Sequence, residues 1–153
     1  MHTQGMMRED ALKDKVILIT GGGSGLGKSM GTYFLELGAK LIITSRKLEK
    51  LEKAAEEMKA KTGGEVLCVA GDVRNYEDAE NVIEKAYEKF GRVDILLNNA
   101  AGNFISPTER LSPGAFDAII GIVLKGTVNF TLALGKKWIA DKQPGNILNV
   151  VTT

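Results

Sequence analysis

Short apolar segments alternate with longer helical ones along the whole chain, and this order limits the fold more than any other feature of the sequence. The apolar segments are KVILIT (15–20), KLIITS (40–45), EVLCVA (65–70), VDILLN (93–98) and NILNVV (146–151). The segments between them, 26–37, 47–64, 76–91 and 113–140, have the spacing of amphipathic or apolar helices. Strands that are apolar on both faces and joined by helices predict a parallel sheet covered on both sides, the doubly wound α/β arrangement.

The composition indicates one soluble globular domain. The 153 residues suit a single core, and 44% of them are apolar and 25% charged. With 20 basic and 19 acidic side chains, the net charge is +1 and there is no basic stripe, which argues against a nucleic-acid partner. No apolar run approaches the roughly 18 to 20 residues of a membrane span, and the N-terminus lacks an apolar signal region. We therefore expect a cytoplasmic protein with no membrane partner.

Cysteine and histidine are too scarce for several kinds of site. Cys68 is the one cysteine and lies in a strand-like segment, so we expect a buried, inert thiol and no disulfide. The one histidine, His2, belongs to an expected disordered tail over residues 1–12. A histidine-based catalytic triad and a His/Cys metal site are thereby excluded, and no metal is expected.

A glycine-rich segment, TGGGSGLG (20–27), follows the first predicted strand and opens the first predicted helix. Gly21, Gly25 and Gly27 suit a tight turn, a close approach to a pyrophosphate and close packing of the helix, whose N-terminus favours negative charge. The spacing fits neither G-x-G-x-x-G nor the Walker pattern. A plain strand-to-helix connection is the alternative, but the strand–turn–helix setting favours a phosphate site.

The end of the second predicted strand reads TSRK, which bears on the choice of cofactor. An acidic residue here would bind the ribose 2′-hydroxyl of NAD, whereas an arginine can accept a 2′-phosphate. The segment has no carboxylate before Glu49, and Arg46 offers a planar fork, assisted by Ser45 and Lys47. These residues predict NADPH rather than NADH; the alternative is an ordinary solvated arginine at the start of a helix.

Three motifs in order resemble those of the short-chain dehydrogenases/reductases: T-G-x-x-x-G-x-G at 20–27, GDV at 71–73 and NNAAG at 98–102. The resemblance implies a Rossmann-like fold, in which Asp72 contacts the adenine ring and Asn98 steadies the central strand. The cofactor-binding residues that we predict are Gly21, Ser24, Gly25, Leu26, Gly27, Ser45, Arg46, Asp72, Val73, Asn99 and Ala100.

The longer stretch NNAAGNFISPTERLSPGAF (98–116) closely resembles the 2,4-dienoyl-CoA reductases of that family. The resemblance implies that Asn103 orients the substrate thioester and that Arg74, Phe104 and Ser112 contact the acyl-CoA. Thr152 stands where the wider family has a serine at the end of the fifth strand, and we count it with Asn103 as catalytic. Val123 stands where ordinary members carry an asparagine that relays protons, which argues against a generic carbonyl reductase.

The implied activity is NADPH-dependent reduction of 2,4-dienoyl-CoA thioesters in unsaturated fatty-acid β-oxidation. The family's catalytic tyrosine and ribose-binding lysine would follow Thr153, so we expect residues 13–153 to form an incomplete NADP-binding domain, truncated after the fifth strand and inactive alone. The complete enzyme is expected to be a homo-oligomer, a tetramer. Two alternatives stay open: a generic NADPH-dependent carbonyl or 3-oxoacyl reductase, and a nucleotide-binding remnant without turnover.

Overall fold

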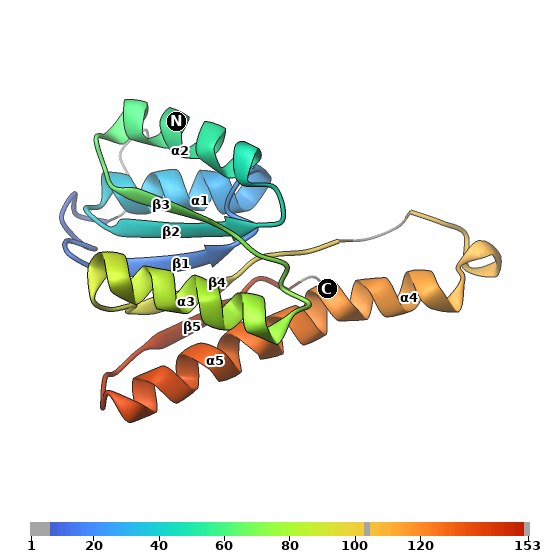
Figure 1. Ribbon diagram of the computed structural model, residues 1–153. Helices are drawn as coiled ribbons and strands as arrows, with labels where there is room; N and C mark the ends of the chain where they lie inside the picture. The colour runs from blue at the N-terminus through green and yellow to red at the C-terminus, as the bar shows by residue number, and fades with distance from the viewer. Residues whose placement is uncertain (1–6, 103–104, 152–153) are drawn as a thin grey trace.

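A five-stranded parallel sheet forms the centre of the molecule in the computed structural model, which describes residues 7–102 and 105–151 (Figure 1). The strand order is β3-β2-β1-β4-β5. The strands are β1 (Val16–Thr20), β2 (Lys40–Ser45), β3 (Val66–Ala70), β4 (Ile95–Asn98) and β5 (Asn146–Asn149). Each lies within one of the five predicted segments, so the predicted parallel sheet is confirmed.

Helices cover both faces of the sheet. Side chains alternate along β1, so that Ile17 and Ile19 pack with α1 and α2, while Val16 and Leu18 pack with α3 and α5. The helical elements are α1 (Gly25–Glu36), α2 (Leu48–Thr62), α3 (Tyr76–Phe90), the 3-10 turn η1 (Thr108–Arg110), α4 (Pro113–Ile120), the π-helical turn η2 (Gly121–Lys125) and α5 (Gly126–Ala140). The doubly wound, Rossmann-like class that the sequence predicts is confirmed.

The strand order reverses beside β1, and this reversal places the candidate site. The chain runs from β1 outward to β2 and β3, then crosses to β4 on the other side of β1. All five residues of β1 are at most 2% exposed, so the central strand is rigidly held. In open α/β sheets, ligands bind outside the carboxyl ends of the strands at such a switch point, here the loops that follow β1 and β4.

The last strand is the least protected part of the sheet. Among the described residues β5 pairs with β4 alone, and all four of its residues are exposed. Ile147 and Leu148 are 41% and 54% exposed. An apolar edge strand of this kind can pair with another chain.

The helices α4, η2 and α5 run together as one 28-residue helix whose first part extends away from the sheet (Figure 1). Its most apolar stretch reaches a mean hydropathy of 1.6, which by length and composition alone is sufficient for a membrane span. No uninterrupted apolar run reaches this length, but the helix as a whole passes the test because single charged residues such as Lys125 are widely spaced. Core helices of soluble proteins can pass the same test.

Residues 7–14, at the boundary of the expected N-terminal tail, form turns in the structure. The backbone N–H of Leu12 donates to the carbonyl oxygen of Leu37 at 2.9 Å, and the Leu12 side chain packs against the core cluster under α1 and α2. Leu12 therefore anchors the start of the domain.

Cys68 on β3 is half-buried rather than fully buried. Partial burial raises the pKa of its thiol, because desolvation disfavours the thiolate. Since the thiolate is the reactive form, we expect iodoacetamide to alkylate Cys68 more slowly at pH 8 than it alkylates a cysteine in an unstructured peptide, with the rate still rising at higher pH. Mass spectrometry of timed samples measures this rate, and denaturant should remove the difference. Equal rates in native and denatured protein would contradict the expectation.

Candidate functional site

The turn after β1 is hydrogen-bonded to the end of β4. The hydroxyl oxygen of Thr20 accepts the backbone N–H groups of Asn99 and Ala100, each at 3.0 Å. The side-chain amide of Asn99 donates back to the carbonyl oxygens of Thr20 and Gly21, at 3.1 and 3.3 Å. Two segments that lie about 80 residues apart in the sequence thus form one rigid surface at the carboxyl edge of the sheet.

Two glycines of the predicted phosphate turn are required for different reasons. A Cβ atom at Gly27 would lie 2.5 Å from the carbonyl oxygen of Gly21 and 2.6 Å from Nδ2 of Asn99, so only glycine lets α1 approach the turn this closely. Gly25 has a φ of +52°, which other residues rarely adopt. A Cβ atom added at Gly25 would have no described atom within 4 Å. Gly27 therefore serves packing, whereas Gly25 faces outward, where a ligand can approach.

The N-terminus of α1 is exposed to this space. Ser24 precedes the helix with an extended backbone, and within the described chain its side chain forms no capping hydrogen bond. Leu26, in the first turn, is 56% exposed. Backbone N–H groups at a helix start lack intrahelical partners and favour an anion. Ser24, Gly25 and Leu26 are therefore positioned as a phosphate cradle requires.

A cavity of about 360 Å³ lies beside this cradle. Five of the predicted cofactor residues line it: Ser24, Ser45, Arg46, Asp72 and Val73. The other lining residues are Lys47, Lys50, Gly71, Ala101 and Ile122. Three cations thus surround the cavity, against one carboxylate, which gives it an electrostatic preference for anions.

Lys50 and Ile122 are contributors that the sequence reading missed. Lys50 lies four residues after Arg46, in the first turn of α2, so the helical spacing after the TSRK segment was the available signal. Ile122 lies in the π-helical turn η2, and its Cδ1 atom would be 3.0 Å from a Cβ atom at Gly102. Its approach to the loop after β4 depends on the docking of a distant helix, for which the sequence gives no signal.

The loop after β3 is fixed from several sides. The backbone N–H of Asp72 donates to a carboxylate oxygen of Asp78 at 2.8 Å, and the buried side chain of Asn129 donates to the carbonyl oxygen of Val73 at 2.8 Å. A Cβ atom at Gly126 would lie 2.7 Å from Cγ2 of Val73, so α5 approaches this loop closely. Asp78, Asn129 and Gly126 were not predicted, yet they place Asp72 and Val73 at the cavity.

Asp72 and Arg74, which the sequence assigned to two different ligands, bind each other. The Arg74 guanidinium contacts both carboxylate oxygens, with Nε at 2.9 and 3.0 Å and Nη2 at 2.5 Å from its nearest oxygen. The backbone N–H of Arg74 donates to the same carboxylate at 3.0 Å. These hydrogen bonds lower the pKa of Asp72 below its usual value and raise that of Arg74.

The predicted catalytic and substrate residues have mixed placements. Asn103, Phe104 and Thr152 lie outside the described residues. Ser112 is the N-cap of α4, where its hydroxyl oxygen accepts the backbone N–H of Ala115 at 3.1 Å, followed by a proline in the first turn. Neither Ser112 nor Arg74 lines the cavity. Five of the predicted cofactor residues therefore line one cavity, whereas of the described substrate residues Arg74 reaches it only through Asp72 and Ser112 does not line it.

The buried side chain of Asn98 joins β4 to its neighbours. Its amide nitrogen donates to Oδ1 of Asn149 on β5 at 2.9 Å and lies 3.2 Å from the hydroxyl of Thr131 on α5. These contacts join β4 to β5 and α5, in line with the strand-steadying role expected for Asn98.

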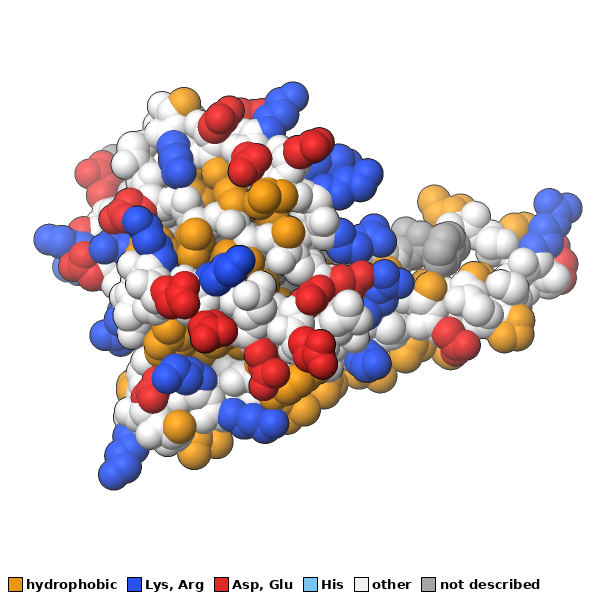
Figure 2. Space-filling model, in the orientation of Figure 1, with side chains coloured by type: hydrophobic (Ala, Val, Ile, Leu, Met, Phe, Trp, Pro, Cys, Tyr) orange, Lys and Arg blue, Asp and Glu red, His pale blue; other side chains and the backbone are white. Residues whose placement is uncertain are grey.

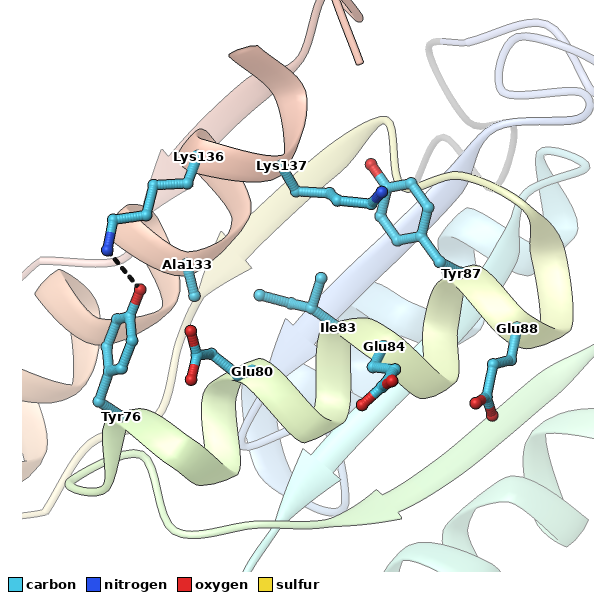
Figure 3. Close-up of a pocket in the computed structure, with 9 residues that line it drawn as sticks. All are labelled: Tyr76, Glu80, Ile83, Glu84, Tyr87, Glu88, Ala133, Lys136 and Lys137. Carbon is cyan, nitrogen blue, oxygen red and sulfur yellow. Dashed lines mark hydrogen bonds between the residues drawn. The ribbon is translucent and has the colours of Figure 1, made fainter. Parts of the chain in front are cut away.

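A larger cavity, of about 580 Å³, lies between α3 and α5 and away from the carboxyl edge (Figure 3). Its walls carry two tyrosine–lysine pairs. The ammonium of Lys136 lies 5.1 Å from the ring centre of Tyr76 and donates to its hydroxyl at 3.0 Å, and that of Lys137 lies 4.8 Å from the ring centre of Tyr87. These cation–π contacts hold the two helices together. None of the residues that line this cavity lines the one at the carboxyl edge, so the two are separate.

Apolar side chains are exposed along the arm that α4 and η2 form beyond the sheet (Figure 2). Phe116, Val123 and Leu124 are between 40% and 58% exposed.

Within residues 7–102 and 105–151, no three His, Cys, Asp or Glu side chains gather where they could bind a metal ion.

Comparison with known proteins places this site in a family context. A family model described as short chain dehydrogenase matches residues 15–153. The Caenorhabditis elegans protein named "Probable 2,4-dienoyl-CoA reductase 3" is 47% identical over 146 residues, which are 95% of this chain and 47% of that protein. A Bacillus subtilis protein named "Probable 2,4-dienoyl-CoA reductase" is 44% identical over 142 residues, 93% of this chain and 56% of the relative.

The crystal structure of a short chain dehydrogenase from Bacillus anthracis has the same fold, with a TM-score of 0.84 and 49% sequence identity. The match covers 93% of this chain and 57% of that one. The chain thus spans about half the length of the curated relatives it matches. Their names differ in the product, a (3E)-enoyl-CoA for the C. elegans protein and a (2E)-enoyl-CoA for the B. subtilis protein.

Proposed function

The chain belongs to the short-chain dehydrogenase family, and from this premise we propose that it forms the cofactor-binding part of an NADPH-dependent 2,4-dienoyl-CoA reductase. The observation that carries the proposal is the cation-lined cavity beside the glycine-rich turn. The names of the relatives, at 39–47% identity over most of the chain, support the substrate class.

The residues of the cavity fit a nicotinamide dinucleotide. The open space at Gly25 and the free N-terminus of α1 suit the pyrophosphate. Arg46, Lys47 and Lys50 gather at the end of β2, where a dinucleotide presents its adenosine ribose, and no acidic residue of the cavity lining comes from that segment. A 2′-phosphate would satisfy this positive charge better than a hydroxyl would, which supports NADPH.

The bound cofactor would supply the hydride to the conjugated thioester. The proposed task of this chain is to hold it and to stabilise the charge that develops on the thioester oxygen. We assign the donors for that charge to the amide of Asn103 and the hydroxyl of Thr152, and contacts with the acyl-CoA to Arg74, Phe104 and Ser112. Val123 in η2 replaces the asparagine of ordinary members, so proton relay through that position is absent.

The proposed setting is unsaturated fatty-acid β-oxidation in the cytoplasm, with acyl-CoA as the substrate partner, no membrane or nucleic-acid partner, and a homotetramer as the complete enzyme. The 153-residue chain alone is proposed to bind the cofactor without turnover, because the tyrosine and lysine that the family uses are not among its residues at the expected positions.

Binding and turnover test the proposal separately. We expect the chain to bind NADPH at least tenfold more tightly than NADH in a fluorescence titration, because the 2′-phosphate adds charge-assisted hydrogen bonds worth about 1.5–3 kcal/mol. The full-length enzyme should oxidise NADPH with a 2,4-dienoyl-CoA and not with a simple ketone. Equal affinities would overturn the cofactor assignment, and turnover of the ketone alone would favour a generic carbonyl reductase.

A further inference from the structure

Arg74 contacts the cofactor cavity only through another residue. Asp72 lines the cavity, whereas the Arg74 side chain packs beside the π-helical turn, where its Cδ atom would lie 3.5 Å from a Cβ atom at Gly121. The Asp72 side chain is 18% exposed and that of Arg74 is 43% exposed. The arginine thus binds the carboxylate without lining the cavity itself.

The Asp72–Arg74 pair has more hydrogen bonds than an ordinary surface ion pair. Exposed ion pairs with a single contact contribute about 0–1 kcal/mol. Here three N–H donors, Nε, Nη2 and the backbone N–H of Arg74, bind one carboxylate, and the backbone of Asp72 is itself held by Asp78. A carboxylate has about four acceptor positions. The three donors of Arg74 fix its rotation and leave about one acceptor position, which a ligand donor can reach because Asp72 lines the cavity.

We propose that Arg74 is a positioning residue of the cofactor cavity: it holds the Asp72 carboxylate in one orientation, so that Asp72 can accept a hydrogen bond from the adenine amino group. The proposal rests on the proposed function in placing the adenosine end of the cofactor in this cavity. The proposal therefore predicts that Arg74 affects cofactor binding even when no acyl-CoA is present. Contacts that orient a ligand-binding side chain are themselves required for tight binding.

The test measures the affinity of the chain for NADPH and for 2′,5′-ADP, which carries the adenosine end alone, with no acyl-CoA present. Arg74→Ala should weaken both by about tenfold, the lower range for a hydrogen bond to a charged group. In an Asp72→Ala background, Arg74→Ala should have no further effect, because its contribution acts through Asp72. Circular dichroism and thermal unfolding verify that each variant is folded.

Arg92→Ala is the matched control, because Arg92 also binds an aspartate two residues away in the sequence, Asp94, but neither residue lines the cavity. Its NADPH affinity should stay unchanged. Unchanged affinity in Arg74→Ala, or losses that add in the double variant, would overturn the proposal and leave the proposed function intact. Failure of the unsubstituted chain to bind NADPH would overturn the proposed function and this inference together.

Discussion

Arg46→Ala is expected to weaken NADPH binding by roughly 10- to 100-fold and to change NADH binding by less than about twofold. The reason is that the guanidinium lies at the cavity beside Ser45, Lys47 and Lys50, where it can donate charge-assisted hydrogen bonds to a 2′-phosphate. One such interaction is worth about 1.5–3 kcal/mol, which corresponds to this range of affinity. Equilibrium titration with each cofactor measures the two dissociation constants.

Arg8→Ala provides the control for loss of one positive charge, because Arg8 pairs with Asp10 in the exposed N-terminal turn. Its NADPH affinity should match that of the unsubstituted chain. Equal losses for NADPH and NADH in Arg46→Ala would show that Arg46 stabilises the fold or binds a group that both cofactors share, and the assignment to the 2′-phosphate would fail.

Gly27→Ala is expected to destabilise the fold by about 1–3 kcal/mol and to abolish cofactor binding at ordinary concentrations. The added methyl group would meet the carbonyl oxygen of Gly21 and the amide of Asn99 at 2.5 and 2.6 Å. Both are backbone or hydrogen-bonded groups, so α1 or the turn must shift, with the cost typical of an overpacked site. Denaturant unfolding measures the loss of stability, and titration with NADPH measures the loss of binding.

Gly135→Ala separates this clash from the general effect of replacing a glycine in a helix. Gly135 lies within α5, and a Cβ atom there would meet no described atom within 4 Å. Since alanine has the higher helix propensity, this variant should be as stable as the unsubstituted chain or more stable by about 0.5–1 kcal/mol, with unchanged binding. A stable, NADPH-binding Gly27→Ala protein would contradict the close packing of α1 on the turn.

The sequence predicted the sheet because its signals are local. Each strand is a short apolar run, and β1, with neighbours on both sides and helices on both faces, is apolar at every position before Thr20. The observed strand ends differ from the predicted ones by a few residues; β5, for example, ends at Asn149 rather than at Val151. That predicted cofactor residues line one cavity was also predictable, because parallel strands end at one edge and so bring the loops after β1, β2 and β3 together.

The remaining features of the site depend on contacts between distant parts of the chain. Asn129 holds the carbonyl of Val73 from a position 56 residues away, and only the docking of α5 on the loop after β3 brings the two together. Asp72 and Arg74 were each predicted as binding residues. Their spacing of two residues in a loop does not show that the two side chains bind each other. Ile122 enters the cavity through a π-helical turn, which the apolar pattern of the helix does not reveal.

The contrast between β1 and β5 also divides this chain by local stability. The phosphate cradle and Asn99 are fixed to β1, whose backbone can open only when the two core layers separate, so its opening free energy approaches that of global unfolding. In this 153-residue chain all four residues of β5 are exposed, so its backbone opens at lower cost. Amide hydrogen exchange should therefore be much slower at the cradle than along β5, and a nucleotide bound at the cradle is retained through the local openings of this chain.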